Sequence, residues 1–106
     1  MSLDNQKCVP CEGGVDKISI KDAIILNKAI PQWKIVNKHH LVREYKFKDF
    51  KEALKFVNSV GKIAEKEGHH PDIVLKWGYV KIKLFTHAIR GLHQNDFIIA
   101  AKIDKL

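Results

Sequence analysis

The stretch that decides the fold is DFKEALKFVNSVGKIAEKEG, residues 49–68 of the 106-residue chain. Its apolar residues recur at helical intervals: Phe50, Ala53, Leu54, Val57, Val60 and Ile63. This spacing predicts an amphipathic helix with one buried face. Asp49 and Glu52 have the spacing of a helix-start capping box. Gly68 suits the helix end, because glycine adopts a positive φ without strain.

A β-hairpin is predicted directly after this helix, with strands over residues 73–77 and 80–86. The second strand alternates, with Val80, Ile82 and Leu84 on one face and Lys81, Lys83 and Phe85 on the other. Such alternation is typical of a half-buried strand. We expect Gly78 and Tyr79 to form the two-residue turn of the hairpin.

Further elements are expected on both sides of this helix and hairpin. A helix begins at Ser19 and ends at Pro31, with an apolar stripe of Ala23, Leu26, Ala29 and Ile30. Residues 33–36 and 41–47 are predicted to form a first pair of strands. A last helix is expected over residues 95–105, with Phe97, Ile98 and Ala101 facing inward.

The resulting element order is α-β-β-α-β-β-α. A helix with one apolar face must bury it, so we expect a two-layer α+β fold: a four-stranded antiparallel sheet with helices packed on one face. Residues 1–17 lack a hydrophobic period and are predicted to be an irregular N-terminal arm, with residues 18–106 as a single domain. No apolar run approaches the roughly 20 residues of a membrane span, so we expect no membrane contact and a cytoplasmic or, alternatively, nuclear location.

Charge and cysteines exclude other classes of protein. The formal net charge is +7, but Arg43 and Arg90 are the only arginines and the lysines are scattered singly. Nucleic-acid binding uses clustered cations and arginine, so we expect a solvated lysine-rich surface and no nucleic-acid partner. Cys8 and Cys11 form a C-x-x-C, half of a zinc site. Two reduced thiols are the preferred interpretation, with metal or redox use as the alternative.

Three histidines fall where the hairpin brings them together. The predicted register places His70 opposite His87, with Pro71 opposite Thr86. Opposed residues in an antiparallel pair have Cβ atoms about 5 Å apart. His69 adjoins them where the helix gives way to the strand. We therefore expect a histidine cluster at one end of the hairpin.

The cluster has more than one interpretation. Imidazole titrates near neutral pH, so grouped histidines suit proton transfer. Glu65, one helical turn before His69, is placed to hydrogen-bond one of the imidazoles. Capping of a helix end is a structural alternative, and zinc binding is another, although adjacent His69 and His70 rarely direct both rings at one ion. From the residues alone, proton chemistry and a structural role stay equally open.

The ordered set of these residues resembles the signature of the pterin-4a-carbinolamine dehydratase family. The matching positions are Glu65-x-x-x-His69-His70-Pro71, Trp77, His87 and Asp96. Similar positions outside this core are Trp33, Phe47-Lys48-Asp49-Phe50 and Cys8-Val-Pro-Cys11-Glu12-Gly13-Gly14. The resemblance therefore covers nearly the whole chain. Gly68 and Ile89 depart from it, since some members carry an acidic residue and animal members often a cysteine at those places.

The resemblance implies a hydro-lyase that converts 4a-hydroxytetrahydropterin to quinonoid dihydropterin. This reaction recycles the tetrahydrobiopterin cofactor of aromatic amino-acid hydroxylases, and it needs neither metal nor cofactor. A homodimer or homotetramer, built partly by joining sheets edge to edge, is also implied. The alternative is non-enzymatic: a protein-interaction and dimerisation role, or a molybdopterin-related role on the same fold.

The resemblance also assigns roles to residues. His69, His70 and His87 would surround the pterin as catalytic residues. We expect His69 and His87 to handle protons at opposite faces, while His70 binds and polarises the pyrazine ring. Glu65 would orient an imidazole, and Asp96 is expected to be chiefly a helix-start carboxylate. The substrate-binding set would be Gly68, His69, His70, Pro71, Phe85, Thr86, His87 and Ala88.

Overall fold

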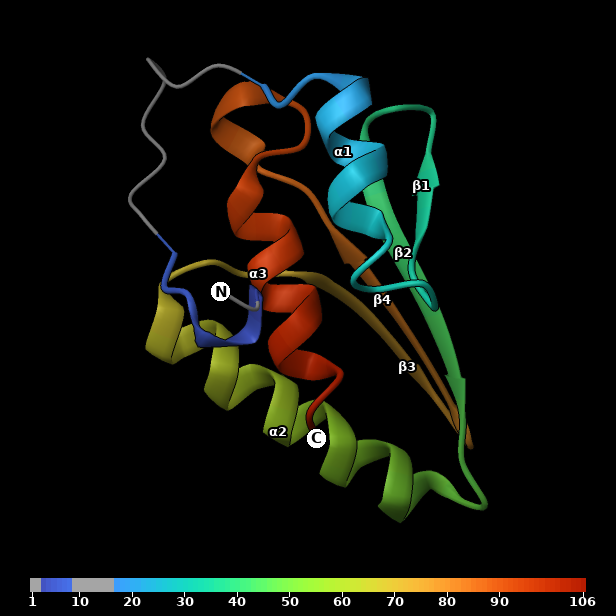
Figure 1. Cartoon of the computed structure of the whole chain (residues 1–106). Helices are drawn as coiled ribbons and strands as arrows, with labels where there is room; N and C mark the ends of the chain where they lie inside the picture. Colours follow the sequence, from blue (N-terminus) through green and yellow to red (C-terminus); the bar gives the residue numbers. More distant parts are fainter. Residues whose placement is uncertain (1–2, 9–16) are drawn as a thin grey trace.

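The computed structural model describes residues 3–8 and 17–106. Its helical elements are η1 (Leu3–Asn5, 3-10), α1 (Ile20–Asn27), α2 (Phe50–Glu67), η2 (His87–Ile89, 3-10) and α3 (Gln94–Ile103). Its strands are β1 (Lys34–Val36), β2 (His40–Lys46), β3 (Asp72–Lys76) and β4 (Tyr79–Leu84). Within these residues the strands form one antiparallel sheet in the order β1-β2-β4-β3. The helices lie on one face of the sheet, which confirms the expected α+β fold (Figure 1).

The long helix α2 begins and ends as its sequence predicts. The side chain of Asp49 accepts a hydrogen bond from the backbone N–H of Glu52, at 2.9 Å. Gly68 follows the helix in the left-handed conformation, with φ of 65°. The buried face is narrower than expected, because Phe50 and Leu54 are exposed. Packing therefore uses only part of the apolar stripe.

The first and last α-helices of the chain, α1 and α3, differ from expectation mainly at their boundaries. Ser19 caps α1 by accepting from the N–H of Asp22, but the helix ends at Asn27, before Pro31. Ala29 consequently lies beyond the helix and is exposed, against expectation. The last helix, α3, runs between α1 and α2 (Figure 1). Most of it is buried, which makes α3 the centre of the helical layer.

The core lies between α3 and the covered face of the sheet. The sheet contributes alternate residues, namely Leu41, Val80, Ile82 and Leu84. The helix contributes Phe97, Ile98, Ile99 and Ile103. Burying this much apolar surface stabilises the fold by roughly 1.5–3 kcal/mol for each large side chain. The core thereby fixes the ends of β4 and α3, from which the site is built.

The hairpin turn is one residue earlier than predicted. Lys76 pairs with Tyr79, so the two loop residues are Trp77 and Gly78. Gly78 has φ of 65°, and a Cβ there would lie 2.8 Å from the carbonyl oxygen of Phe47. The prediction placed the glycine first in the turn, whereas the left-handed conformation is needed at the second position. The whole register consequently moves by two residues.

The N-terminal segment is only partly the irregular arm that the sequence suggested. Leu3 is buried in the core, and Lys102 Nζ donates to the carbonyl oxygen of Asp4 at 2.9 Å. The backbone N–H of Cys8 donates to Glu67 Oε1 at 3.0 Å. Cys11, and with it the C-x-x-C interpretation, lies outside the described residues. In the part of the chain that is described, no helix is long and apolar enough to cross a membrane.

Candidate active site

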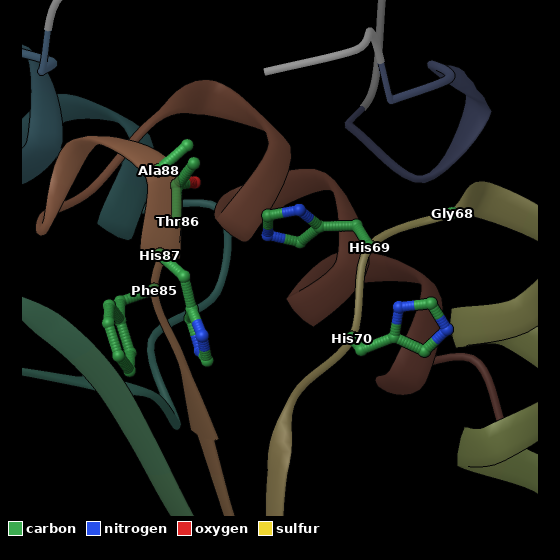
Figure 2. Close-up of a pocket in the computed structure, with 7 residues that line it drawn as sticks. All are labelled: Gly68, His69, His70, Phe85, Thr86, His87 and Ala88. Atoms are coloured by element: carbon green, nitrogen blue, oxygen red, sulfur yellow. The ribbon is translucent and has the colours of Figure 1, made fainter. Parts of the chain in front are cut away.

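A hollow of about 260 Å³ opens where α2 gives way to β3, beside the end of β4. Its lining residues are Gly68, His69, His70, Phe85, Thr86, His87 and Ala88 (Figure 2). The structure therefore brings together the expected substrate-binding set, with the exception of Pro71, which is absent from this lining. The site lies at a junction of elements whose positions the core fixes.

His69 is held by a buried carboxylate. Its Nε2 lies 2.6 Å from Asp96 Oδ1, with the side chains 11% and 0% exposed. The second oxygen, Oδ2, accepts from Thr86 Oγ1 and from the backbone N–H of His93, each at 2.9 Å. A buried carboxylate needs such donors, since an unpaired one would be strongly destabilising. Because the carboxylate accepts, the Nε2 of His69 donates, and its Nδ1 is left for other chemistry.

Asp96 is more than the helix-start carboxylate that the sequence indicated. It does occupy the first turn of α3 and completes a capping box with His93. His93 itself caps the helix, because its Nδ1 accepts from the N–H of Asn95 at 3.1 Å. The same Asp96 side chain also bonds to His69, which lines the hollow. Sequence periodicity gives no sign of this second contact, because it joins residues 27 positions apart.

His70 points away from the other two histidines. Figure 2 shows the His69 ring directed toward the wall that carries Thr86 and His87, and the His70 ring turned toward α2. There His70 Nε2 contacts Glu65 Oε2, and the imidazole is 59% exposed. The expected pairing of His70 with His87 is wrong. Counting outward from Asp72, which pairs with Lys83, would bring Phe85 and not His87 opposite His70.

His87 stands on the opposite wall of the hollow, beyond the end of β4. Its ring is stacked on Phe85, with centroids 4.2 Å apart and an interplanar angle of 20°. The side chain is 61% exposed, and its Nε2 lies 4.0 Å from Asp72 Oδ1. Asp72 was not anticipated by the sequence reasoning. Its position was implicit in the hairpin in either register, because Asp72 starts β3 and faces the end of β4.

This arrangement can move protons at two places. One imidazole is sheltered and oriented by a carboxylate, and the other is open to solvent on the facing wall. Two such groups can serve as base and acid for one bound molecule. Among the described residues, no group of three or more metal-ligand side chains is arranged to hold one metal ion.

Comparison with known proteins places this chain in a family. The family model described as pterin 4 alpha carbinolamine dehydratase matches residues 15–106. A relative from Alkaliphilus metalliredigens, which carries the name pterin-4-alpha-carbinolamine dehydratase, is 53% identical over 98% of this chain and 95% of its own length. The corresponding relative from Rubrobacter xylanophilus is 47% identical over 98% of this chain and 97% of its own.

A solved structure agrees with this fold. A transcriptional coactivator/pterin dehydratase from Brucella melitensis superposes with a TM-score of 0.79 and 27% identity, over 85% of this chain and 97% of that chain. The fold, the matched residues and the relatives agree. The chain belongs to the pterin-4a-carbinolamine dehydratase family.

Proposed function

We propose that this chain is a hydro-lyase that dehydrates 4a-hydroxytetrahydropterin to quinonoid dihydropterin. The observation that carries the proposal is the pairing of buried Asp96 with His69 across the hollow from His87. In the reaction the C4a–O bond breaks, the N5–H proton leaves, and one water departs. One base and one acid are therefore sufficient, without metal or cofactor.

His69 is the proposed base. Its Nε2–H donates to Asp96, so the lone pair on Nδ1 accepts the N5 proton. Asp96 cannot turn away easily, since Thr86 and His93 hold its other oxygen. A carboxylate in this position fixes the tautomer and stabilises the imidazolium that forms. The bonding pattern thus prepares one ring nitrogen for proton removal.

His87 is the proposed acid, which gives a proton to the departing hydroxyl. Its exposed ring can exchange protons with water after each turnover, while His69 releases the proton that it gained. Each such group contributes typically 10²–10⁴-fold to a rate. The backbone of Phe85 to Ala88 would contact the edge of the pterin.

His70 is proposed to bind substrate rather than to transfer a proton. Its ring points toward α2, away from His87 (Figure 2), and Glu65 orients it. Gly68 lies two residues before His70 in the lining of the hollow, and it leaves the hollow open because glycine adds no side chain there. The prediction that His70 polarises the pyrazine ring remains part of this proposal.

The test is a coupled assay. A hydroxylase generates the carbinolamine, and the absorbance of quinonoid dihydropterin is followed with and without the purified chain. We expect the chain to accelerate product formation, and the double variant His69→Ala, His87→Ala to lose the acceleration while its circular dichroism stays native. An unaccelerated wild-type reaction, or a fully active double variant, contradicts the proposal.

We also propose that the chain acts as a homodimer or homotetramer in the cytoplasm, in the recycling of a hydroxylase's pterin. Strands β1 and β3 form the edges of the sheet, and an unpaired edge favours association. On β3, Val74 is 44% exposed, and Trp77 beyond it is 71% exposed. Sedimentation should therefore give a multiple of the 12.2 kDa chain mass.

A non-enzymatic interaction role is the second candidate. It is favoured by Ile24 and Ile25 on α1, which are 53% and 54% exposed, since clustered apolar side chains mark interaction surfaces. The histidine double variant distinguishes the two candidates. A biological effect that survives in that variant supports interaction, or another role on this fold such as molybdopterin metabolism.

A further inference from the structure

Three aromatic rings form a row from the turn between β1 and β2 to the hollow. His39, in that turn, lies with its ring centroid 4.7 Å from that of Phe85, at an interplanar angle of 41°. Phe85 in turn stacks on His87 at 4.2 Å. Phe85 and His87 line the hollow side by side (Figure 2), whereas His39 is not part of the lining. His39 is therefore a support behind the wall of the site.

His87 depends on this row for its position. With 61% of its side chain exposed, it lacks the packing that orients a buried residue. Its ion-pair partner Asp72 is itself 55% exposed and 4.0 Å away, so that interaction is weak and screened by solvent. In the described part of the chain, the aromatic contact of His87 is the face of Phe85. The orientation of the imidazole thus follows that of the phenyl ring.

Phe85 is in turn held in place by its other neighbours. It follows the last residue of β4 and projects from the open face of the sheet, as Lys83 does two residues earlier. Lys83 Nζ lies 5.4 Å from the Phe85 ring centroid, a cation–π distance. A flexible lysine side chain restricts the orientation of the phenyl ring weakly, whereas an aromatic ring on a fixed backbone restricts it well. His39 supplies such an aromatic ring.

The turn fixes His39. Its backbone N–H donates to the carbonyl oxygen of Val36 at 2.9 Å, and Asn37 and Lys38 adopt left-handed φ values of 53° and 56°. Its Nδ1 lies 3.2 Å from His40 Nδ1, where one ring donates and the other accepts. Burial lowers the pKa of His40, and the positive charge of Lys83 lowers it further. The lowered pKa favours the neutral form of His40, and a contact between two imidazole nitrogens requires at least one neutral ring to accept.

We infer that His39 is a positioning residue of the proposed dehydratase site, acting through Phe85 to hold the imidazole of His87. The inference rests on the proposed function for its kinetic consequence, but not for its structural one. A displaced acid reduces the rate, and a misplacement of 1 Å can cost as much as 10²-fold. We expect His39→Ala to lower kcat about tenfold, with a smaller change in KM.

Nuclear magnetic resonance of the free protein tests the structural link without any substrate. Stacked on Phe85, the His87 ring protons are shielded by the phenyl ring current. We expect their resonances to move toward unshielded positions in His39→Ala. In His39→Phe, which keeps a ring at the same place, they should stay near the wild-type values. Lys38→Gly is the matched control, because it removes a side chain from the same turn at a residue of positive φ and spares the ring row.

Kinetics of the same three variants completes the test. Loss of kcat in His39→Ala, recovery in His39→Phe and a wild-type rate in Lys38→Gly support the inference. Unchanged His87 resonances in a folded His39→Ala variant overturn it, as does an equal loss in His39→Phe. If the wild type shows no dehydratase activity while the resonances move as expected, the proposed function fails and the positioning contact stands.

Discussion

Asp96 carries three hydrogen bonds, one to a proposed catalytic base and two that hold the local structure. In Asp96→Asn, the amide offers one acceptor oxygen, so at least one of the three donors faces an NH₂ group. We expect kcat to fall about 10- to 100-fold, the usual cost of losing a partner that orients a histidine. The free energy of unfolding should fall by about 1–3 kcal/mol.

The control for this variant is Asp22→Asn. Asp22 is also an acidic residue in a first helical turn, but it is exposed on α1. Steady-state kinetics and urea denaturation should leave this control near wild type. Equal kinetics in both variants would show that the Asp96 carboxylate does not orient His69.

The side chain of Tyr45 lowers the stability of the fold through a single atom, its hydroxyl oxygen. Its hydroxyl is buried and has no hydrogen-bond partner among the described residues. Burial raises its pKa well above the ordinary value of 10, although Arg43 over the ring opposes the shift. The unfolded chain therefore releases the phenolic proton at a lower pH than the folded protein. The ionisation of Tyr45 therefore leaves stability unchanged below about pH 10 and lowers it progressively as the pH rises beyond that value.

Tyr45→Phe should therefore stabilise the protein by about 1 kcal/mol at neutral pH, because it removes an unpaired buried polar group. It should also make stability fall less steeply between pH 9 and about pH 11. Urea denaturation across this range measures both effects. A destabilised variant would show that the hydroxyl has a partner in solution.

At the scale of elements, alanine substitution at two glycines, Gly78 and Gly61, should change stability in opposite directions. Gly78→Ala forces a side chain into a left-handed turn and against the Phe47 carbonyl, and it should cost about 1–3 kcal/mol. Gly61→Ala lies inside α2, where a Cβ would meet nothing within 4 Å. It should stabilise by about 0.5–1 kcal/mol. Thermal unfolding of the pair compares them directly, and a neutral Gly78→Ala would refute the proposed constraint on the turn.

The same glycine shows what the sequence could predict of the elements. The boundaries of α2 followed from Asp49 and Gly68, since caps are local and their chemistry is written in adjacent residues. The hairpin turn did not follow, because the constraint on Gly78 comes from Phe47, thirty-one positions away, at the end of another strand. One wrong turn position moved the register by two residues. It thereby placed His87, instead of Phe85, opposite His70.

At the scale of the whole molecule, the N-terminal residues are part of the fold. Leu3 lies in the core, and neighbouring residues bond to α2 and α3. We expect Leu3→Ala to reduce the free energy of unfolding by roughly 2–3 kcal/mol, as for other buried leucines. Leu106→Ala, at an exposed leucine at the other end of the chain, should change it by less than about 0.5 kcal/mol. Similar values for both would show that Leu3 is not buried in solution.

The predictability of the site also belongs to this scale. The histidine cluster was expected because the predicted hairpin paired His70 with His87 and chain continuity added His69. That register was wrong, but His69 and His87 do line one hollow. The bond between His69 and Asp96 was not expected, because it requires the start of α3 to lie against the end of α2. That placement is set by the burial of α3 as a whole. No local pattern of residues encodes it.

The double use of Asp96 couples two events that are usually separate. Fraying of the first turn of α3 breaks the bond to the His93 N–H, and it also releases His69, because one carboxylate serves both. The coupling is reciprocal, so any molecule that immobilises His69 must slow amide hydrogen exchange at the start of α3. Warming should correspondingly abolish catalytic activity through local opening of this turn, at temperatures where the sheet is still folded.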